Sequence, residues 1–560
     1  MKTQVSITVK PEQEKDSALI ERLITTQLKK QDYAFFEKYS RAKTRQNVFI
    51  KKSIDARHGQ VKLHLRYQVY VDEQPPSLEQ ALPVWKKADG KKTVVIVGSG
   101  PAGLFTALKL LEYGIKPIIL ERGTDTIQRR KDIALISTQD KVNGESNYCF
   151  GEGGAGTFSD GKLYTRSNKR GDISSILKIF HVFGADEKIL TDAHPHIGTD
   201  RLPKIINAMR NKIIELGGEV RFGCKCTDFV IEAGRVKGVV CASGGPSTGS
   251  GTTNGVSGTA GTTKIRADAV ILATGHSATD VYMLLAKIAP GALEAKTFAV
   301  GVRVEHPRQV IDRIQYHQQA DDPSKNLGAA EYRVTTQVDG RGVYSFCMCP
   351  GGFVVPSASG PDEIVVNGMS AAARNSKWSN AAIVVETRPE DIPQAFVEQA
   401  AKLGSPNLAG LLFRTDIEQK AKQAGKGQAA PAQLLTDFLK NEPTPPQRLP
   451  QTSYTPGIVS SNLNDWMPPK ITSRLAQGIK QIDKSMKGFI DPAALMIAPE
   501  TRTSTPVRIL RNKETMECSA LPGLYPAGEG SGYAGGIVSS AMDGVNVAEA
   551  ITSSFYPKPE

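Results

Sequence analysis

Hydrophobic positions in the N-terminal part of the chain follow two different periods. Residues 5–10 (VSITVK) and 61–71 (VKLHLRYQVYV) place an apolar side chain at every second position, whereas residues 17–28 (SALIERLITTQL) have helical spacing. A period of two indicates a half-buried strand, and a period of 3.6 indicates an amphipathic helix. We therefore expect a small α+β domain of the ferredoxin-like type over residues 1–85.

A continuous apolar run opens the next segment, after a linker with several prolines and lysines at 75–92. TVVIVG (93–98) has the composition of a strand buried on both faces, and a helical run at 101–113 follows it. Pro101 stands where the first turn of a helix tolerates proline, and Gly114 can end the helix. A second apolar run, IKPIIL (115–120), ends at Glu121. This order predicts a parallel βαβ unit.

The later patterns predict a domain inserted into the first one. RADAVILATG (266–275) indicates another buried strand, and residues 217–241 indicate an antiparallel meander before it. A Gly/Ser/Thr tract at 242–264 has almost nothing to bury, which is typical of a flexible insertion. Short β-rich pieces fill 290–460, apart from a helical stretch near 391–440. The expected fold class is α/β, with a Rossmann-type domain at 92–285, an inserted, mostly antiparallel β domain at 286–498, and the end of the Rossmann-type domain at 499–560.

The turn GSGPAG (98–103) matches the GxGxxG pattern of dinucleotide-binding sites. Gly98 permits a tight turn, Gly100 lets the backbone approach a pyrophosphate, and Gly103 lets helix and strand pack closely. The start of the helix offers unpaired N–H groups to the phosphates. Glu121 lies 23 residues after Gly98, where an acid accepts both ribose hydroxyls. This unit alone leaves NAD and FAD open.

The segments after this unit favour FAD. GEGGAGTFSDGKL (151–163) is a second glycine-rich loop without an apolar strand before it, so it does not begin another Rossmann unit. Such a loop suits close wrapping around a large, flat cofactor. A resident NAD(P)H domain would require a second strand–GxGxxG–helix–acid unit, and the sequence has none.

Seven segments resemble the successive signatures of a family of bacterial-type FAD-dependent dehydrogenases, which have the glutathione-reductase-type FAD fold. The segments are KKSIDAR (51–57), NYCFGEGGAGTFSDGKL (147–163), HIGTDRL (196–202), ATGHSA (273–278), FCMCPGGFV (346–354), ETRTSTPVR (500–508) and LYPAGEGSGYAGGIVSSAMDG (524–544). The resemblance spans nearly the whole chain apart from 242–264. It implies a FAD domain with an inserted substrate domain and a small N-terminal domain, and it implies no substrate.

The resemblance also implies how the last segment binds the cofactor. In flavoproteins of this fold an acid after Gly, usually Asp, binds the ribityl chain, and Glu529 occupies that position here. Gly535, Gly536 and Ile537 begin a helix whose N–H groups should face the flavin N1–C2=O edge, where reduced flavin is negative. One FAD is therefore expected to join both glycine turns. The residues predicted to bind it are Gly98, Gly100, Pro101, Ala102, Gly103, Glu121, Arg122, Gly153, Gly154, Ala155, Gly156, Cys226, Ala273, Thr274, Gly275, Gly528, Glu529, Gly535, Gly536 and Ile537.

Four polar residues are candidates for the chemistry at the flavin. Arg502 and Arg508 come just before the final FAD strand, where either could clamp a substrate carboxylate or phosphate. A structural Arg–Glu pair is an equal alternative for them. His276 directly follows the ATG of 273–275. GVRVEHP (301–307) puts Arg303 on one face of a strand and His306 on the other, where a histidine before a proline is more typical of a turn.

Seven cysteines include two pairs with CxC spacing, Cys224 with Cys226 and Cys347 with Cys349. On a strand, side chains two apart share a face. A zinc site is disfavoured because the pairs lie on expected strands of different domains and lack CxxC turns. A redox-active Cys347/Cys349 pair beside the flavin and simple apolar packing both stay open. No metal site is expected.

The net charge of +13 is concentrated at the N-terminus, where residues 1–92 carry 19 Lys and Arg against 11 Asp and Glu. Such a module could bind nucleic acid or an acidic partner. A solvated basic surface is the simpler interpretation, because no nucleic-acid-binding motif accompanies the charge.

The remaining composition indicates an enzyme of the cytoplasm. No apolar run is long enough to span a membrane, the start has no signal-peptide core, and the odd number of cysteines fits a reducing compartment. We expect a FAD-dependent dehydrogenase or reductase that transfers a hydride between a small molecule and flavin N5, with NAD(P)H binding transiently or another redox partner recycling the flavin. A flavin monooxygenase and an RNA-associated flavoprotein using residues 1–92 are the alternatives. The oligomeric state stays open.

Overall fold

The computed structural model describes residues 1–56, 60–77, 82–165, 171–243, 261–317, 320 and 327–557. Most of the predicted insertion at 242–264 lies outside these residues. No helix in these ranges is both long and apolar enough to cross a membrane.

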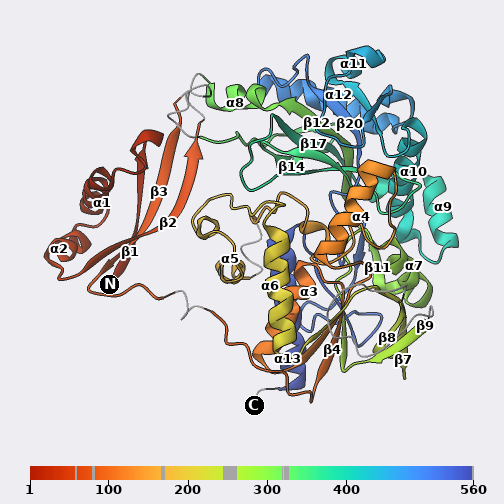
Figure 1. The fold of residues 1–560 in the computed structure, drawn as a ribbon, viewed down its shortest axis with the longest axis horizontal. Helices are drawn as coiled ribbons and strands as arrows, with labels where there is room; N and C mark the ends of the chain where they lie inside the picture. The colour runs from red at the N-terminus through yellow and green to blue at the C-terminus, as the bar shows by residue number, and fades with distance from the viewer. Residues whose placement is uncertain are drawn as a thin grey trace.

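The N-terminal unit is a three-stranded antiparallel sheet with two helices on one face. Alternating residues of its strands, such as Val5, Leu65 and Val69, pack against Ile24 and Leu28 of the first helix. The unit stands to one side of the molecule, with its helices on the outer side (Figure 1). Its elements are β1 (Lys2–Val9), α1 (Ser17–Gln31), α2 (Tyr33–Arg41), β2 (Arg45–Asp55) and β3 (Lys62–Val71).

The α+β prediction for this unit is confirmed, but the ferredoxin-like order is wrong. A ferredoxin-like domain has the order βαββαβ, with its two helices in separate crossovers. Here both helices lie between β1 and β2, and the sheet order is β1-β3-β2. After β3 the chain continues through residues 72–74 into the proline-containing linker at 75–92, and the described residues of this stretch form neither a second crossover helix nor a fourth strand.

A five-stranded parallel sheet of order β22-β10-β4-β5-β6 forms the Rossmann-type part. Strands β4, β5, β10 and β22 are mainly apolar and buried, as expected for a sheet covered on both faces, whereas the edge strand β6 has the half-buried sequence Glu-Val-Arg. Helices α3, α6 and α13 lie together along one face (Figure 1). The bounds are β4 (Thr93–Val97), α3 (Pro101–Glu112), β5 (Lys116–Leu120), α4 (Thr126–Gln139), α5 (Ile173–Val182), α6 (Leu202–Glu215), β6 (Glu219–Arg221), β10 (Ala269–Leu272), β22 (Leu524–Pro526) and α13 (Ile537–Phe555).

The predicted meander before the ATG segment is a separate three-stranded antiparallel sheet. Phe229, Val236 and Val239 of this sheet are buried against the Rossmann-type part. Its strands are β7 (Cys224–Glu232), β8 (Arg235–Ser243) and β9 (Gly261–Arg266).

Between β10 and β22 the chain builds a seven-stranded sheet of order β13-β14-β17-β12-β20-β18-β19, in which only β18 and β19 are parallel neighbours. The prediction of an inserted, mostly antiparallel unit is confirmed. The strands are β12 (Phe298–Pro307), β13 (Thr335–Val338), β14 (Arg341–Cys349), β17 (Trp378–Thr387), β18 (Ala430–Leu434), β19 (Ile458–Ser460) and β20 (Leu495–Glu500). Other elements of this region are α7 (Thr279–Ile288), β11 (Leu293–Ala295), α8 (Arg308–Tyr316), β15 (Phe353–Pro356), β16 (Val366–Met369), α9 (Gln394–Lys402), α10 (Ala409–Ala424), α11 (Leu435–Lys440), α12 (Pro469–Ser485) and β21 (Val507–Ile509).

Candidate functional site

A cleft of about 910 Å³ is bordered by segments of both the parallel sheet and the seven-stranded sheet. The carboxyl ends of β4, β5 and β10 open into it, which is where open α/β sheets bind their ligands. Its volume lies at the upper end of the range for cofactor and ligand sites. We call one set of its lining residues the glycine-rich part: Gly98, Gly100, Gly154, Gly156, Gly275, Gly528, Gly535 and Gly536.

The first glycine turn has the geometry that its sequence predicts. Gly98 has φ +108°, and a Cβ there would lie 2.3 Å from the carbonyl oxygen of Ala273. A Cβ on Gly103 would lie 2.1 Å from the carbonyl oxygen of Gly98. Gly103 therefore allows helix and strand to pack and does not border the cleft, which corrects its assignment as a cofactor contact. Gly100 is the N-cap of α3 and faces the cleft.

Glu121 is already saturated with hydrogen bonds. One oxygen accepts the N–H groups of Gly123 and Gly151, each at 3.0 Å. The other accepts the N–H of Ser99 at 3.0 Å and its hydroxyl at 2.7 Å. Because a carboxylate offers about four acceptor positions, this side chain ties both glycine loops together. Its contact with ribose stays a prediction that requires one of these bonds to be shared.

Arg129 holds the loop at 147–154 in place, and the sequence did not predict this role. This side chain is fully buried and donates to five backbone carbonyls, those of Asn147, Tyr148, Gly151, Glu152 and Gly154, at 2.7–3.1 Å. Burial lowers the pKa of Arg129 to about 10, so the guanidinium remains charged at neutral pH. Nothing in its local sequence distinguishes it from a surface arginine.

The predicted loop residues fall into two groups. Gly154, Ala155 and Gly156 border the cleft, and their contact with the cofactor stays a prediction. Gly153 does not, because its N–H donates to the carbonyl of Ser99 and a Cβ there would lie 2.0 Å from Thr157 Oγ1. Its role is to fix the loop, which corrects the prediction of a cofactor contact.

The final glycine segment opens into the same cleft. Glu529, Gly535, Gly536 and Ile537 border it, and a Cβ on either Gly535 or Gly536 would meet nothing within 4 Å. The helix that follows, α13, lies against α3. Two helix N-termini therefore face one cleft, and each can bind negative charge through its free N–H groups.

His276 and Glu529 meet in the cleft, with Nδ1 and Oε2 3.5 Å apart. Both side chains are largely buried. The sequence predicts His276 as a catalytic residue and Glu529 as a ribityl contact. The structure brings these two residues, which were predicted from different motifs, into contact.

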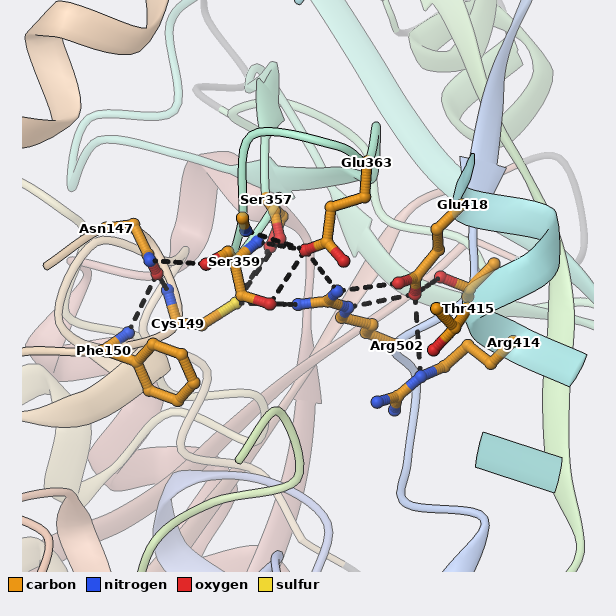
Figure 2. A network of polar contacts seen from close by, with 12 residues as sticks. Asn147, Cys149, Phe150, Ser357, Ser359, Glu363, Arg414, Thr415, Glu418 and Arg502 are labelled. Carbon is orange, nitrogen blue, oxygen red and sulfur yellow. Dashed lines mark hydrogen bonds and ion pairs between the residues drawn. The ribbon is translucent and has the colours of Figure 1, made fainter. Parts of the chain in front are cut away.

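Arg502 matches the structural alternative rather than the substrate clamp. Figure 2 shows its guanidinium between Glu363 and Glu418 of α10, and both Arg502 and Cys149 border the cleft. Nε and Nη2 donate to the two oxygens of Glu418 at 3.0 and 2.7 Å, and Nη2 also donates to Glu363 at 2.6 Å. Nη1 donates to Ser359 Oγ at 2.8 Å and to Cys149 Sγ at 3.6 Å. All five N–H groups are in use, so none remains for a substrate carboxylate.

Arg508 and Arg303 differ in whether their side chains border the cleft. Arg508 borders the cleft, donates to the exposed Glu294 at 2.7 Å, and has an Nε without a hydrogen-bond partner among the described residues. Arg303 is 0% exposed and does not reach the cleft, so its assignment as a catalytic residue is wrong. It donates to Glu500 at 3.0 Å and to Asn380 at 2.8 Å, because it points into the interior between strands.

A second group of cleft residues, which we call the charged part, escaped prediction. Arg374 donates to both oxygens of Asp160, at 2.7 and 3.3 Å, and also to Glu331. Lys162 Nζ lies 3.4 Å from Asp160 Oδ2. Burial alone would raise the pKa of Asp160, but the two cations hold it well below its usual value. The charged part consists of Asp160, Lys162, Glu331, Tyr332, Arg333, Asn367 and Arg374.

The two cysteines of β14 occupy different environments. The register of β14 against β17 shifts between Phe346 and Cys349, and Cys347 has φ +46°. Cys347 borders the cleft, whereas Cys349 is fully buried. The expectation that both side chains share one strand face therefore fails at this bulge. A redox role for them stays a prediction.

The remaining predicted cofactor contacts also border the cleft: Pro101, Ala102, Arg122, Cys226, Ala273, Thr274, Gly275 and Gly528. Among them, Arg122 stacks on Phe150 with 4.2 Å between its Cζ atom and the ring centre.

Comparison with known proteins identifies the cofactor. Residues 91–139 match the model of a FAD binding domain, and residues 297–503 match that of a C-terminal domain-like region of FAD-dependent proteins. Residues 1–70 match a domain of unknown function. An uncharacterized protein of Clostridium beijerinckii is 38% identical over 524 residues, covering 90% of this chain and 92% of its own. The chain belongs to this family of FAD-dependent proteins. Its cofactor is FAD, and it is a flavoprotein of the oxidoreductase type.

Solved structures show weaker similarity to this FAD-dependent protein. A geranylgeranyl bacteriochlorophyll reductase-like protein of Thermoplasma acidophilum is 13% identical, with 83% and 80% of the two chains covered and a TM-score of 0.33. CtdE in complex with FAD is 11% identical, with 82% and 84% covered and a TM-score of 0.31. Values this low carry no information about the reaction.

Proposed function

We propose that this flavoprotein is a dehydrogenase or reductase that transfers a hydride between a small-molecule substrate and flavin N5. One observation supports this most: the cleft that contains both glycine turns continues into the charged part. It therefore has room and polar groups for a substrate beside the cofactor. NAD(P)H, binding transiently, is the electron donor that we expect.

The residues of the glycine-rich part fit FAD. Gly100 at the start of α3 and Gly154 would lie along the pyrophosphate, since neither has a side chain to occupy that space. Gly535 and Gly536 leave open space at the start of α13 for the flavin half. When bound, FAD supplies N5 as hydride acceptor or donor, and the substrate releases or takes up one proton in the same step.

His276 and Glu529 are the residues that we assign to this proton. The carboxylate of Glu529 lies against Nδ1, which orients the ring and leaves Nε2 on its other side. A histidine held in this way can accept a proton from a substrate hydroxyl or amine and return it in the reverse direction. Arg508, which borders the cleft, can contact the substrate's polar groups beside it.

Anaerobic reduction of the purified protein tests this proposal. NADH, NADPH and a panel of metabolites should include a donor that bleaches the flavin without oxygen. The variant His276→Gln should keep its FAD while reduction by the substrate slows by about 10²–10⁴-fold. His64→Gln is the matched control, because His64 lies on an exposed face of β3. Oxygen consumption that requires an aromatic substrate would favour a monooxygenase instead, and FAD that no donor reduces would contradict both.

A further inference from the structure

Lys162 carries a cation whose hydrogen-bonding capacity is only partly used. An ammonium has three donors. Among the described residues, the contacts of Nζ are Asp160 Oδ2 at 3.4 Å, without hydrogen-bond geometry, and Cys349 Sγ at 3.8 Å. Asp160 itself is taken up by Arg374, which reaches both of its oxygens. Burial opposes the charge on Lys162, but Cys349 and Asp160 raise its pKa above the usual value, so it stays protonated.

Tyr332 provides a second unused polar group in the same part of the cleft. Its side chain is 7% exposed, and its hydroxyl has no hydrogen-bond partner in the described parts of the chain. The ring is held edge-on against Phe489, with 5.8 Å between the ring centres. A buried hydroxyl without a partner is uncommon in native proteins and calls for an explanation. A ligand oxygen in the cleft would satisfy it.

Two cations lie beside the sulfur of Cys349. Cys349 Sγ lies 3.8 Å from Lys162 Nζ and 3.9 Å from Arg303 Nη1. Tyr332 belongs to the same part of the cleft, because Arg374 binds both the preceding Glu331 and Asp160, and Asp160 lies beside Lys162. Asn367 also borders the cleft, and its Oδ1 accepts from Arg303 Nη2 at 3.2 Å and from the N–H of Gly368 at 2.7 Å.

The charge around these donors suits a single negative charge. Lys162, Arg333 and Arg374 oppose Asp160 and Glu331, which leaves the charged part with a net charge of +1. Arg374 is neutralised by two carboxylates and Arg303 by Glu500. A phosphate dianion would require more unpaired cations or a bidentate arginine.

The surfaces beside the charged part are aromatic and apolar. Tyr344, Phe346 and Met348 of β14 border the cleft there. Tyr164 and His194 add an edge-to-face pair with 4.9 Å between the ring centres. Aromatic walls favour a flat, apolar molecule, through stacking and area burial.

We propose that the substrate of this site is an aromatic carboxylic acid, whose carboxylate is bound by the Lys162 ammonium and the Tyr332 hydroxyl and whose ring lies against β14. The assignment rests on the proposed function, since it treats the charged part as the substrate-binding region. It names Lys162 and Tyr332 as specificity-determining residues.

Ligand binding to the FAD-loaded protein tests the assignment without turnover. Benzoate and cinnamate are titrated while the visible absorbance of the flavin and the heat of binding are recorded, with benzamide, cinnamamide and inorganic phosphate as comparisons. The carboxylates should perturb the flavin spectrum and bind at least tenfold more tightly than the amides, whereas phosphate should not bind. Lys162→Met should weaken carboxylate binding tenfold or more, and Tyr332→Phe should weaken it three- to tenfold.

Two further variants keep the test decisive. Lys162→Arg retains the charge and should bind benzoate within a few-fold of the parent protein, even if Lys162→Met loses FAD. Lys92→Met is the matched control, because Lys92 is also paired with an aspartate, Asp268, beside β4 and β10 and away from the cleft. Its binding should not change.

Different results would contradict the carboxylate assignment and the proposed hydride transfer. Equal binding of carboxylates and amides, tighter binding of phosphate, or unchanged binding in Lys162→Met and Tyr332→Phe would overturn the carboxylate assignment. If a donor still reduces the flavin in that case, the proposed function survives without it. If FAD is bound but no donor reduces it, the proposed function fails, and the binding data alone decide on the carboxylate.

Discussion

The two parts of the cleft are built by different means. The glycine-rich part consists of backbone groups at the ends of strands and the starts of helices, and its key residues lie within a few positions of one another in each motif. The charged part and the network around Arg502 consist of side chains from segments far apart in the sequence, such as Asp160 with Arg374 and Glu363 with Arg502. The part that we assign to FAD is formed by backbone, whereas the neighbouring walls of the cleft are formed by side chains.

The largest effect on stability should come from the Arg502 network (Figure 2). Arg502→Met leaves Glu363 buried without its cation and leaves Glu418 with Arg414 alone, whose Nε lies 3.6 Å from Oε1. We expect the free energy of unfolding to fall by about 3–5 kcal/mol, as for other buried ion pairs that lose one partner. Chemical denaturation of the FAD-free protein measures it.

Arg508→Met is the matched control for this change. Arg508 pairs with an exposed glutamate, Glu294, so its removal should cost less than about 1 kcal/mol. Equal losses in the two variants would show that the Arg502 network does not hold the cleft wall.

A substitution that strains the backbone of the glycine-rich part should destabilise the protein nearly as much as the loss of Arg502. Gly98→Ala combines a positive φ with a Cβ 2.3 Å from a backbone oxygen. We expect a loss of about 3 kcal/mol in unfolding free energy, together with loss of bound FAD. Gly90→Ala separates the two causes, because Gly90 also has positive φ (+73°) but nothing within 4 Å of its Cβ. That control should lose only about 1 kcal/mol.

Low pH should lower the free energy of unfolding by protonating Glu363 in the Arg502 network. Burial alone would raise the pKa of its carboxyl, but Arg502 and Ser359 lower it to about 2 from an ordinary value of 4.5. The unfolded chain then binds more protons in this range, so the stability from Glu363 is complete above pH 4.5 and is lost as the pH falls towards 2.

Glu363→Gln should flatten this acid dependence by up to about 3 kcal/mol between pH 5 and 2.5. Urea denaturation at a series of pH values measures the slope. Glu390→Gln is the control, since Glu390 is 61% exposed. If the free energy of unfolding depends on pH in the same way in Glu363→Gln, the Glu363 carboxylate does not cause the loss of stability in acid.

The smallest effect should appear where the backbone contacts only the cofactor. Gly535→Ala places a methyl group in open cleft space. Stability of the FAD-free protein should be unchanged, while the affinity for FAD falls about tenfold, which corresponds to about 1.4 kcal/mol. Gly291→Ala also meets nothing within 4 Å but does not border the cleft. If both variants bind FAD like the parent protein, the start of α13 does not contact the cofactor.

The same contrast explains how far the sequence could predict the structure. The βαβ unit, the meander and the cleft-facing Gly98, Gly100 and Gly154 follow from local patterns, because strand, turn and helix each leave a short-range signal. The burial of Arg129 and Arg303 leaves no such short-range signal in the sequence. Burial of an arginine depends on which carbonyls or carboxylates the fold brings to it, and these come from distant positions.

The bulge in β14 shows another limit of the sequence. Alternation predicts that Cys347 and Cys349 share a face, but one shifted register reverses the environment of a side chain. Lys162 and Arg374 were missed for a related reason, since the loop at 159–165 and residue 374 have no pattern that pairs them. Glu529 was found from its motif, whereas its contact with His276 required the fold.

The central claim is that both glycine-rich turns bind one and the same FAD. The most direct measurement is the molar ratio of FAD to protein after saturation, in the parent chain and in Gly98→Ala and Gly535→Ala. The account predicts one FAD per chain, and it predicts that both variants weaken that single site. A ratio of two, a protein that refuses added FAD, or a variant that loses one nucleotide while a second remains bound would contradict it.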